Sequence, residues 1–268
     1  MCIPDSQGSL ASSPGALKRS RTRIFILSLL SLGTMINYLD RTILGIVAPK
    51  LTTEIHIDPA MMGTVFSAFA WTYALAQIPG GMFLDRFGNK LTYALSIFFW
   101  SLFTLLQSFS LGLKSLLLLR LGLGVSEAPC FPANSRIVSK WFPQHERARA
   151  TATYTVGEYI GLAAFSPLLF LILEHHGWRT LFFLTGGLGI LFTFVWWRFY
   201  HEPHESKTAN KAELDYIGAD QVANKSENIP FNWRDAKRLL CCRQIIGASL
   251  GQFAGNTKIG RASCRERV

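Results

Sequence analysis

A few charged side chains interrupt long apolar stretches of this sequence and are the first candidates for chemistry. Asp40 and Arg41 are adjacent in one stretch, Arg120 and Glu127 lie in another, and Glu158 lies in a third. A charge inside a membrane span is costly and usually faces a cavity or a partner. These residues are therefore expected to form a site.

Helical spacing brings the charges together with polar aromatic residues. Arg120 and Glu127 are seven residues apart, almost two helical turns, so they share one face. Tyr38 and Arg41 are three apart and also share a face, and Tyr73 adds a hydroxyl from another apolar stretch. Three helices can thus direct polar side chains into one central cavity.

Such a cavity suits an anion that travels with protons. An arginine presents a rigid fork of donors that fits a carboxylate, so two arginines favour an anionic substrate. A carboxylate held between burial and a neighbouring arginine can load or release a proton as the cavity opens to either side. Alternatively, Asp40 with Arg41 and Arg120 with Glu127 are structural ion pairs; such pairs are weak stabilisers, and two of them favour function.

The apolar stretches that carry these residues predict an all-α transmembrane protein. The chain of 268 residues is 49% hydrophobic, and several of its apolar blocks reach the roughly 20 residues that cross a bilayer core of about 30 Å. We expect six spans, at about residues 24–46, 61–83, 91–109, 116–138, 150–173 and 181–199.

The basic residues predict the orientation. The net charge of +10 does not indicate nucleic-acid binding, because Lys and Arg lie between the apolar blocks and before the first. The loops on one side hold only Lys50, Lys114 and Arg179, whereas the other loops and the N-terminal segment are rich in basic residues. The N-terminus is therefore expected in the cytoplasm.

The remaining segments complete the expected organisation. The C-terminal ten residues resemble translated sequencing-adaptor read-through, with a genuine basic tail as the alternative, and the end of the linker could also lie along the membrane surface. We expect a cytoplasmic tail (residues 1–23), a six-helix transmembrane domain (24–199) and a cytoplasmic linker (200–240). A truncated start of a seventh helix (241–258) and an adaptor-derived artefact (259–268) follow.

Other chemistries are not expected. The five cysteines lack zinc-ligand spacing and a disulfide pattern, so neither a metal nor another cofactor is predicted. No grouping of nucleophile, base and oxyanion donors indicates an enzyme. The small residues Gly186, Gly187 and Gly189 are expected to allow close helix packing.

A loop between the second and third predicted spans carries a recognisable pattern. Residues 81–90, Gly-Met-Phe-Leu-Asp-Arg-Phe-Gly-Asn-Lys, resemble the loop signature of the major facilitator superfamily. The resemblance implies one six-helix half of a twelve-helix transporter, made of two inverted three-helix repeats. It also implies a conformational gating role for Gly81, Asp85, Arg86, Gly88 and Lys90.

Further motifs narrow the resemblance. Residues 37–41, 66–69, 77–81, 120–134 and 141–147 resemble the anion:cation symporter family, and within it the bacterial glucarate, galactonate and hexuronate permeases. The similarity covers about residues 24–256. It implies proton-coupled uptake of a sugar acid by alternating access, in a protein that is monomeric when complete.

The resemblance also implies roles for individual residues. Asp40 and Glu127 would couple protons, while the substrate would be held by Arg41, Arg120, Tyr38, Tyr73 and Gln252. Glu158 would also bind the substrate, because it stands where close relatives carry a glutamine that contacts the substrate. As an acid, it would change the proton number or the choice of substrate.

Other functions stay open at this point. The substrate could be another organic anion, such as an aromatic or dicarboxylic acid. The protein could instead bind a sugar acid as a sensor without moving it. The chain as given could also be inactive, because half of the cavity is expected to be missing.

Overall fold

The computed structural model describes residues 20–55, 57–206, 208–221, 241–247, 249–251 and 254, with the backbone alone for residues 219–221. The chain divides into two units, Met1–Lys225 and Ser226–Val268. Within the described residues all regular secondary structure is helical, as the sequence predicts.

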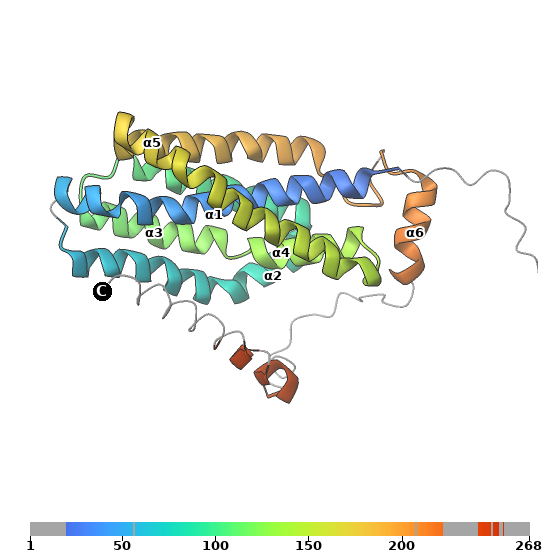
Figure 1. The fold of residues 1–268 in the computed structure, drawn as a ribbon. Coiled ribbons are helices and arrows are strands. Elements are labelled where there is room, and N and C mark those ends of the chain that lie inside the picture. The colour runs from blue at the N-terminus through green and yellow to red at the C-terminus, as the bar shows by residue number, and fades with distance from the viewer. Residues whose placement is uncertain are drawn as a thin grey trace, which may run out of the picture. The chain divides into compact units, whose positions relative to one another are not determined.

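The first unit is a bundle of long helices with one short helix at its end (Figure 1). Its elements are α1 (Thr22–Glu54), α2 (Pro59–Gln107), α3 (Leu113–Glu127), α4 (Cys130–Trp141), α5 (Gln144–Phe199) and α6 (Lys211–Gln221).

Two of these helices each contain a pair of predicted spans joined at a bend. α2 is interrupted at Gly88 (φ 78°, ψ 175°) and α5 at Gly177 (φ 79°, ψ 171°). A side chain disfavours such backbone angles, so glycine allows the chain to turn there. The predicted fourth span is divided between α3 and α4 around Pro129, which has no amide hydrogen to donate to a continuous helix.

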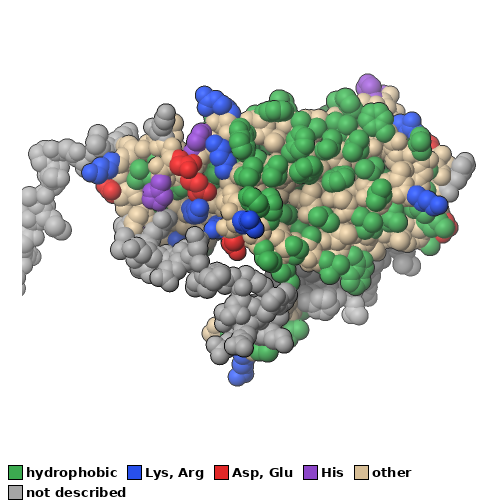
Figure 2. All heavy atoms as spheres, turned by 180° about the vertical axis from the view of Figure 1, so that it is seen from behind, with side chains coloured by type: hydrophobic (Ala, Val, Ile, Leu, Met, Phe, Trp, Pro, Cys, Tyr) green, Lys and Arg blue, Asp and Glu red, His purple; other side chains and the backbone are tan. Residues whose placement is uncertain are grey.

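The surface of the first unit has the character of a membrane protein. Large apolar side chains are exposed along the bundle, among them Trp71, Leu188 and Phe194. Figure 2 shows apolar side chains over the sides of the bundle and charged side chains gathered towards its ends. By length and composition, three stretches of the described chain qualify as spans: Thr22–Glu54, Leu113–Trp141 and Gln144–Phe199.

Small residues allow the helices to approach closely in the interior. A Cβ at Gly124 would lie 2.7 Å from the carbonyl oxygen of Phe69, and one at Gly186 would lie 2.6 Å from the backbone nitrogen of Leu105. Gly189 packs equally tightly against another helix, but Gly187 faces open space. The expectation of close packing therefore holds for two of the three predicted glycines.

The second unit is described only in part. Residues 243–247, 249–251 and 254 are helical, where the sequence predicts the beginning of a seventh helix.

Candidate functional site

The centre of the candidate site is an ion pair between distant parts of the chain. The guanidinium of Arg41, on α1, pairs with Glu127, the last residue of α3. The Glu127 side chain is 1% exposed, whereas that of Arg41 is 26% exposed. The pair therefore has a buried anionic side and an accessible cationic side.

Aromatic rings surround the Arg41 guanidinium. Its central carbon lies 5.1 Å from the ring centre of Tyr38, 5.4 Å from Phe69, 4.9 Å from Tyr73 and 5.7 Å from Phe131. A cation at these distances is attracted by the faces of the rings. The rings also restrict the side chain, so Arg41 presents its donors in a defined direction.

Asp40 and Arg120 lie deeper, in the packed interior between α1, α2 and α3. Thr104 donates a hydrogen bond of 3.4 Å to Asp40 Oδ2, and Arg120 Nε donates one of 2.9 Å to Gln107 Oε1. Each residue also has a buried polar atom, Oδ1 of Asp40 and Nη2 of Arg120, without a hydrogen-bond partner in the described structure. Burial of a polar atom without a hydrogen-bond partner costs free energy. This region is therefore suited to hold an ordered water molecule or to bind a proton.

The pairing differs from the alternative that sequence spacing suggests. Across the residues that the structure covers, neither Asp40 with Arg41 nor Arg120 with Glu127 forms a salt bridge. Arg41 extends to a different helix, since helix packing places Glu127 beside it. Adjacency on one helix could not reveal this arrangement.

Glu158 reaches the same group of residues from α5. It is 8% exposed and lies near Tyr38, on the side of α5 that packs on α1. The two helices are close here because Gly161 packs directly on Met35 of α1. Tyr38 therefore packs its ring beside Arg41 and also lies near Glu158.

The predicted gate residues lie at the other end of this bundle region, around the bend in α2. Asp85 accepts a hydrogen bond of 2.8 Å from Arg136 of α4, and Arg136 also donates to the Leu84 carbonyl oxygen at 3.2 Å. Gly88 forms the bend itself. This contact joins α2, just before its bend, to α4.

The remaining gate residues make looser contacts. Arg86 lies over the ring of Phe87 at 5.8 Å, and the Lys90 ammonium lies 5.5 Å from the ring centre of Trp197. A Cβ at Gly81 would meet open space.

A second polar cluster fastens α6 to the same end. Glu213 of α6 is fully buried and accepts hydrogen bonds from the Ser20 hydroxyl and the Arg23 backbone. Arg23 pairs with Glu146 at 2.6 Å, and the Tyr216 hydroxyl donates to the same carboxylate at 2.8 Å. α6 is thereby tied to the beginnings of α1 and α5.

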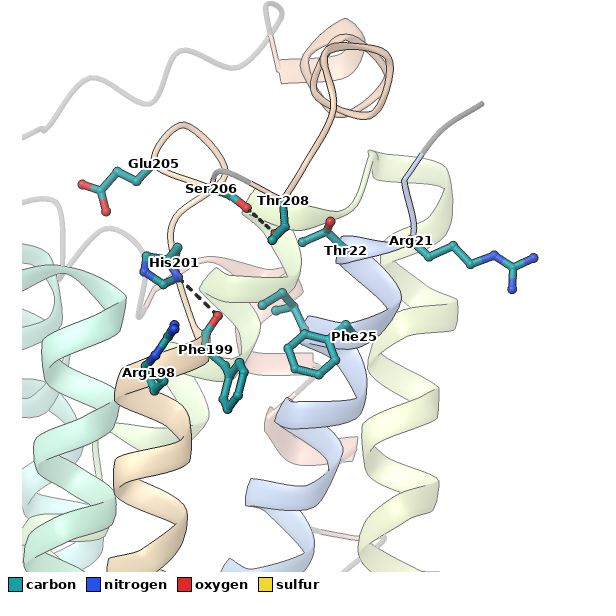
Figure 3. A pocket seen from close by; sticks show the side chains of 10 residues that line it. Arg21, Thr22, Phe25, Arg198, Phe199, His201, Glu205, Ser206 and Thr208 are labelled. Carbon is teal, nitrogen blue, oxygen red and sulfur yellow. Dashed lines mark hydrogen bonds between the residues drawn. The ribbon is translucent and has the colours of Figure 1, made fainter. Parts of the chain in front are cut away.

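A cavity of about 680 Å³ opens beside this cluster, between the start of α1 and the end of α5 (Figure 3). Phe25 and Phe199 meet edge to face inside it, at 5.9 Å between ring centres, while Arg21 points away. The predicted site residues do not line this cavity. It is thus separate from the ion pair.

Sequence reasoning missed several partners in these clusters. Phe69 and Phe131 belong to recognisable motifs, yet their packing on Arg41 depends on how the helices meet. Arg136 could have been found as the charge complementary to Asp85 at the end of the fourth predicted span. Gln252 lies outside the described residues.

Comparison with known proteins gives the family. Residues 30–257 match the model of the Major Facilitator Superfamily. The chain belongs to this superfamily. The resemblance inferred from the sequence motifs is therefore confirmed at the level of the family.

Two curated relatives of this superfamily member are named as transporters of sugar acids. It is 45% identical over 246 residues to a D-galactonate transporter of Escherichia coli O6:H1, covering 89% of this chain and 57% of the relative. It is 42% identical over 254 residues to a probable galactarate/D-glucarate transporter of Escherichia coli K12, covering 89% and 56%. The chain thus spans about half the length of the curated relatives it matches.

Solved structures agree with the fold. A bacterial homologue of the human lysosomal transporter Spinster, in an inward-facing and unoccupied conformation, matches with a TM-score of 0.61 and 26% identity over 71% of this chain and 46% of that chain. The inward-open xylose transporter XylE of E. coli matches with a TM-score of 0.62 at 13% identity, over 76% and 57%. The latter likeness concerns the fold alone.

Proposed function

We propose that this superfamily member transports an anionic sugar acid together with protons by alternating access. The observation that carries the proposal is the Arg41–Glu127 ion pair, whose cationic side is open and whose anionic side is buried. The names of the curated relatives support the substrate class.

The ion pair offers a direct mechanism for coupling. A substrate carboxylate and Glu127 compete for the same guanidinium, because both require the donors of Arg41. A proton on Glu127 removes its charge and frees those donors for the substrate. Anion binding and proton binding therefore favour each other, as linkage requires.

Asp40 and Arg120 form a second place for a proton in this proposal. Both residues are buried in one polar region, and each has a polar atom without a hydrogen-bond partner in the described structure. Protonation of Asp40 therefore changes the electrostatic potential at Glu127 and Arg120. One proton per monoanion moves no net charge. A second proton, on Asp40, lets the membrane potential drive uptake, at about 2.3 kcal/mol per charge for 100 mV.

The remaining site residues orient the sugar and gate the cavity. Tyr38, Tyr73 and Gln252 supply hydrogen-bonding groups to the substrate, and Arg120 adds positive charge behind Arg41. The bend region switches between the two open states through Gly81, Asp85, Arg86, Gly88 and Lys90. The protein works as a monomer in a bacterial inner membrane, with its N-terminus in the cytoplasm.

Transport by purified protein in liposomes tests this function. The intact protein that carries this sequence is reconstituted, and labelled D-galactonate is added outside at low pH with a neutral interior. We expect accumulation above equilibrium that a proton ionophore abolishes. Binding without accumulation would instead identify a sensor.

Competition in the same assay tests the substrate class. Unlabelled aldonates, aldarates and hexuronates are compared with aromatic and simple dicarboxylic acids. Uptake that only the latter acids inhibit would replace the sugar acid by another organic anion.

A further inference from the structure

The named relatives divide between two kinds of sugar acid. D-galactonate carries one carboxylate, whereas galactarate and D-glucarate carry one at each end. The chain is 45% identical to a transporter of the first kind and 42% identical to a probable transporter of the second. These sequence identities do not indicate which kind of sugar acid the site favours. The charges around Arg41 bear on that choice.

Glu158 adds an acidic group to the proposed binding site. It lies near Tyr38, whose ring lies 5.1 Å from the central guanidinium carbon of Arg41. Tyr38 is thus a neighbour of both the cation and the acid. A substrate whose carboxylate binds Arg41 would extend past the Tyr38 ring towards Glu158.

Among the described residues around this place, one arginine offers accessible positive charge. Arg41 is 26% exposed on its side chain, whereas Arg120 is almost fully buried and donates to Gln107. A proton on Glu127 leaves Arg41 free for one carboxylate. Within the described part of the site, a second carboxylate would find Glu158 instead of another cation.

We infer that Glu158 selects sugar acids with one carboxylate over those with two. It accepts hydrogen bonds from the hydroxyl groups of an aldonate and repels the far carboxylate of an aldarate. The inference rests on the proposed function and specifies its substrate. Like charges a few ångströms apart, partly shielded by solvent, cost roughly a tenfold loss of affinity or more.

The test compares the two kinds of substrate as competitors of one labelled substrate. Proton-driven uptake of labelled D-galactonate is measured in proteoliposomes against rising D-gluconate or D-glucarate. With the natural protein we expect D-glucarate to need a concentration at least about tenfold higher for half inhibition. Direct binding of both acids to the detergent-solubilised protein should show the same order.

Glu158→Gln removes the charge while keeping the shape and a hydrogen-bonding group. We expect this variant to lower the ratio of the half-inhibition concentration of D-glucarate to that of D-gluconate about tenfold, mainly because D-glucarate inhibits more strongly. The matched control is Glu174→Gln, which neutralises an exposed acid on the same helix and should leave the ratio unchanged.

The outcomes separate this inference from the proposed function. D-galactonate uptake with equal inhibition by both acids, or with D-glucarate preferred, would overturn the role of Glu158 and leave sugar-acid transport intact. An unchanged ratio in Glu158→Gln would do the same. If the natural protein accumulates neither kind of acid, the proposed function itself fails, and the inference fails with it.

Discussion

At the scale of single residues, the site depends on Arg41 meeting an acid from another helix, Glu127. The sequence reveals which charged residues are inside the spans, because charges stand out in apolar stretches. It does not reveal their partners. Spacing along a helix suggests Arg120 with Glu127, whereas packing brings Arg41 to Glu127 and leaves Arg120 beside Gln107.

Glu127→Gln tests the coupling at this scale. The amide cannot take up a proton, so we expect proton-driven accumulation to disappear while exchange of internal for external substrate persists. Both are measured with the same proteoliposomes, with and without a pH gradient. Glu205→Gln, a change at an exposed acid beyond α5, is the control. Accumulation at the natural rate in Glu127→Gln would exclude this residue from coupling.

At the scale of elements, the length of the apolar stretches predicts the long helices but not the short helix α6. α1 continues past its predicted end at residue 46 to Glu54, through Pro49, because its apolar face remains packed at Val47 and Leu51. α6 falls in the region expected to be a polar linker. A polar helix of 11 residues gives no membrane signal, and its stability comes from buried contacts of Glu213.

Removal of those contacts should loosen α6. Glu213→Ala loses the bonds from Ser20 and Arg23, and hydrogen bonds to a charged group are worth about 1.5–3 kcal/mol each. We expect a lower melting temperature of the purified protein and faster hydrogen exchange in α6. Asp215→Ala, on the exposed face of the same helix, should change neither quantity. Equal protection of α6 in both variants would show that Glu213 does not fasten it.

At the scale of the whole molecule, the proposed orientation rests on charge distribution. The number and order of the spans could be predicted because bilayer thickness sets their length. The bends at Gly88 and Gly177 fall in the gaps between predicted spans, after residues 83 and 173, because the apolar pattern is interrupted there. The continuation of helix on both sides of each bend could not be predicted from apolar content.

Labelling of single cysteines in intact cells tests the orientation. In a cysteine-free background, Thr53→Cys lies at the end of α1 and His204→Cys lies beyond α5, both at exposed positions. We expect a membrane-impermeant maleimide to label residue 53 in intact cells and residue 204 only after the cells are opened. The reverse pattern would place the N-terminus outside.

The bends at Gly88 and Gly177 have nearly the same backbone angles, although they lie at opposite ends of the bundle. Asn89, next to the first, bonds to Glu202 beyond α5, whereas Trp178, next to the second, bonds to Glu54 at the far end of α1. An acid precedes each glycine by three residues, Asp85 in one case and Glu174 in the other. The two bends occupy the same place in the two expected three-helix repeats, so a pair of like turns is what an inverted repeat would produce. The surroundings of the two turns differ: within the described residues, Asp85 pairs with Arg136, whereas Glu174 forms no ion pair.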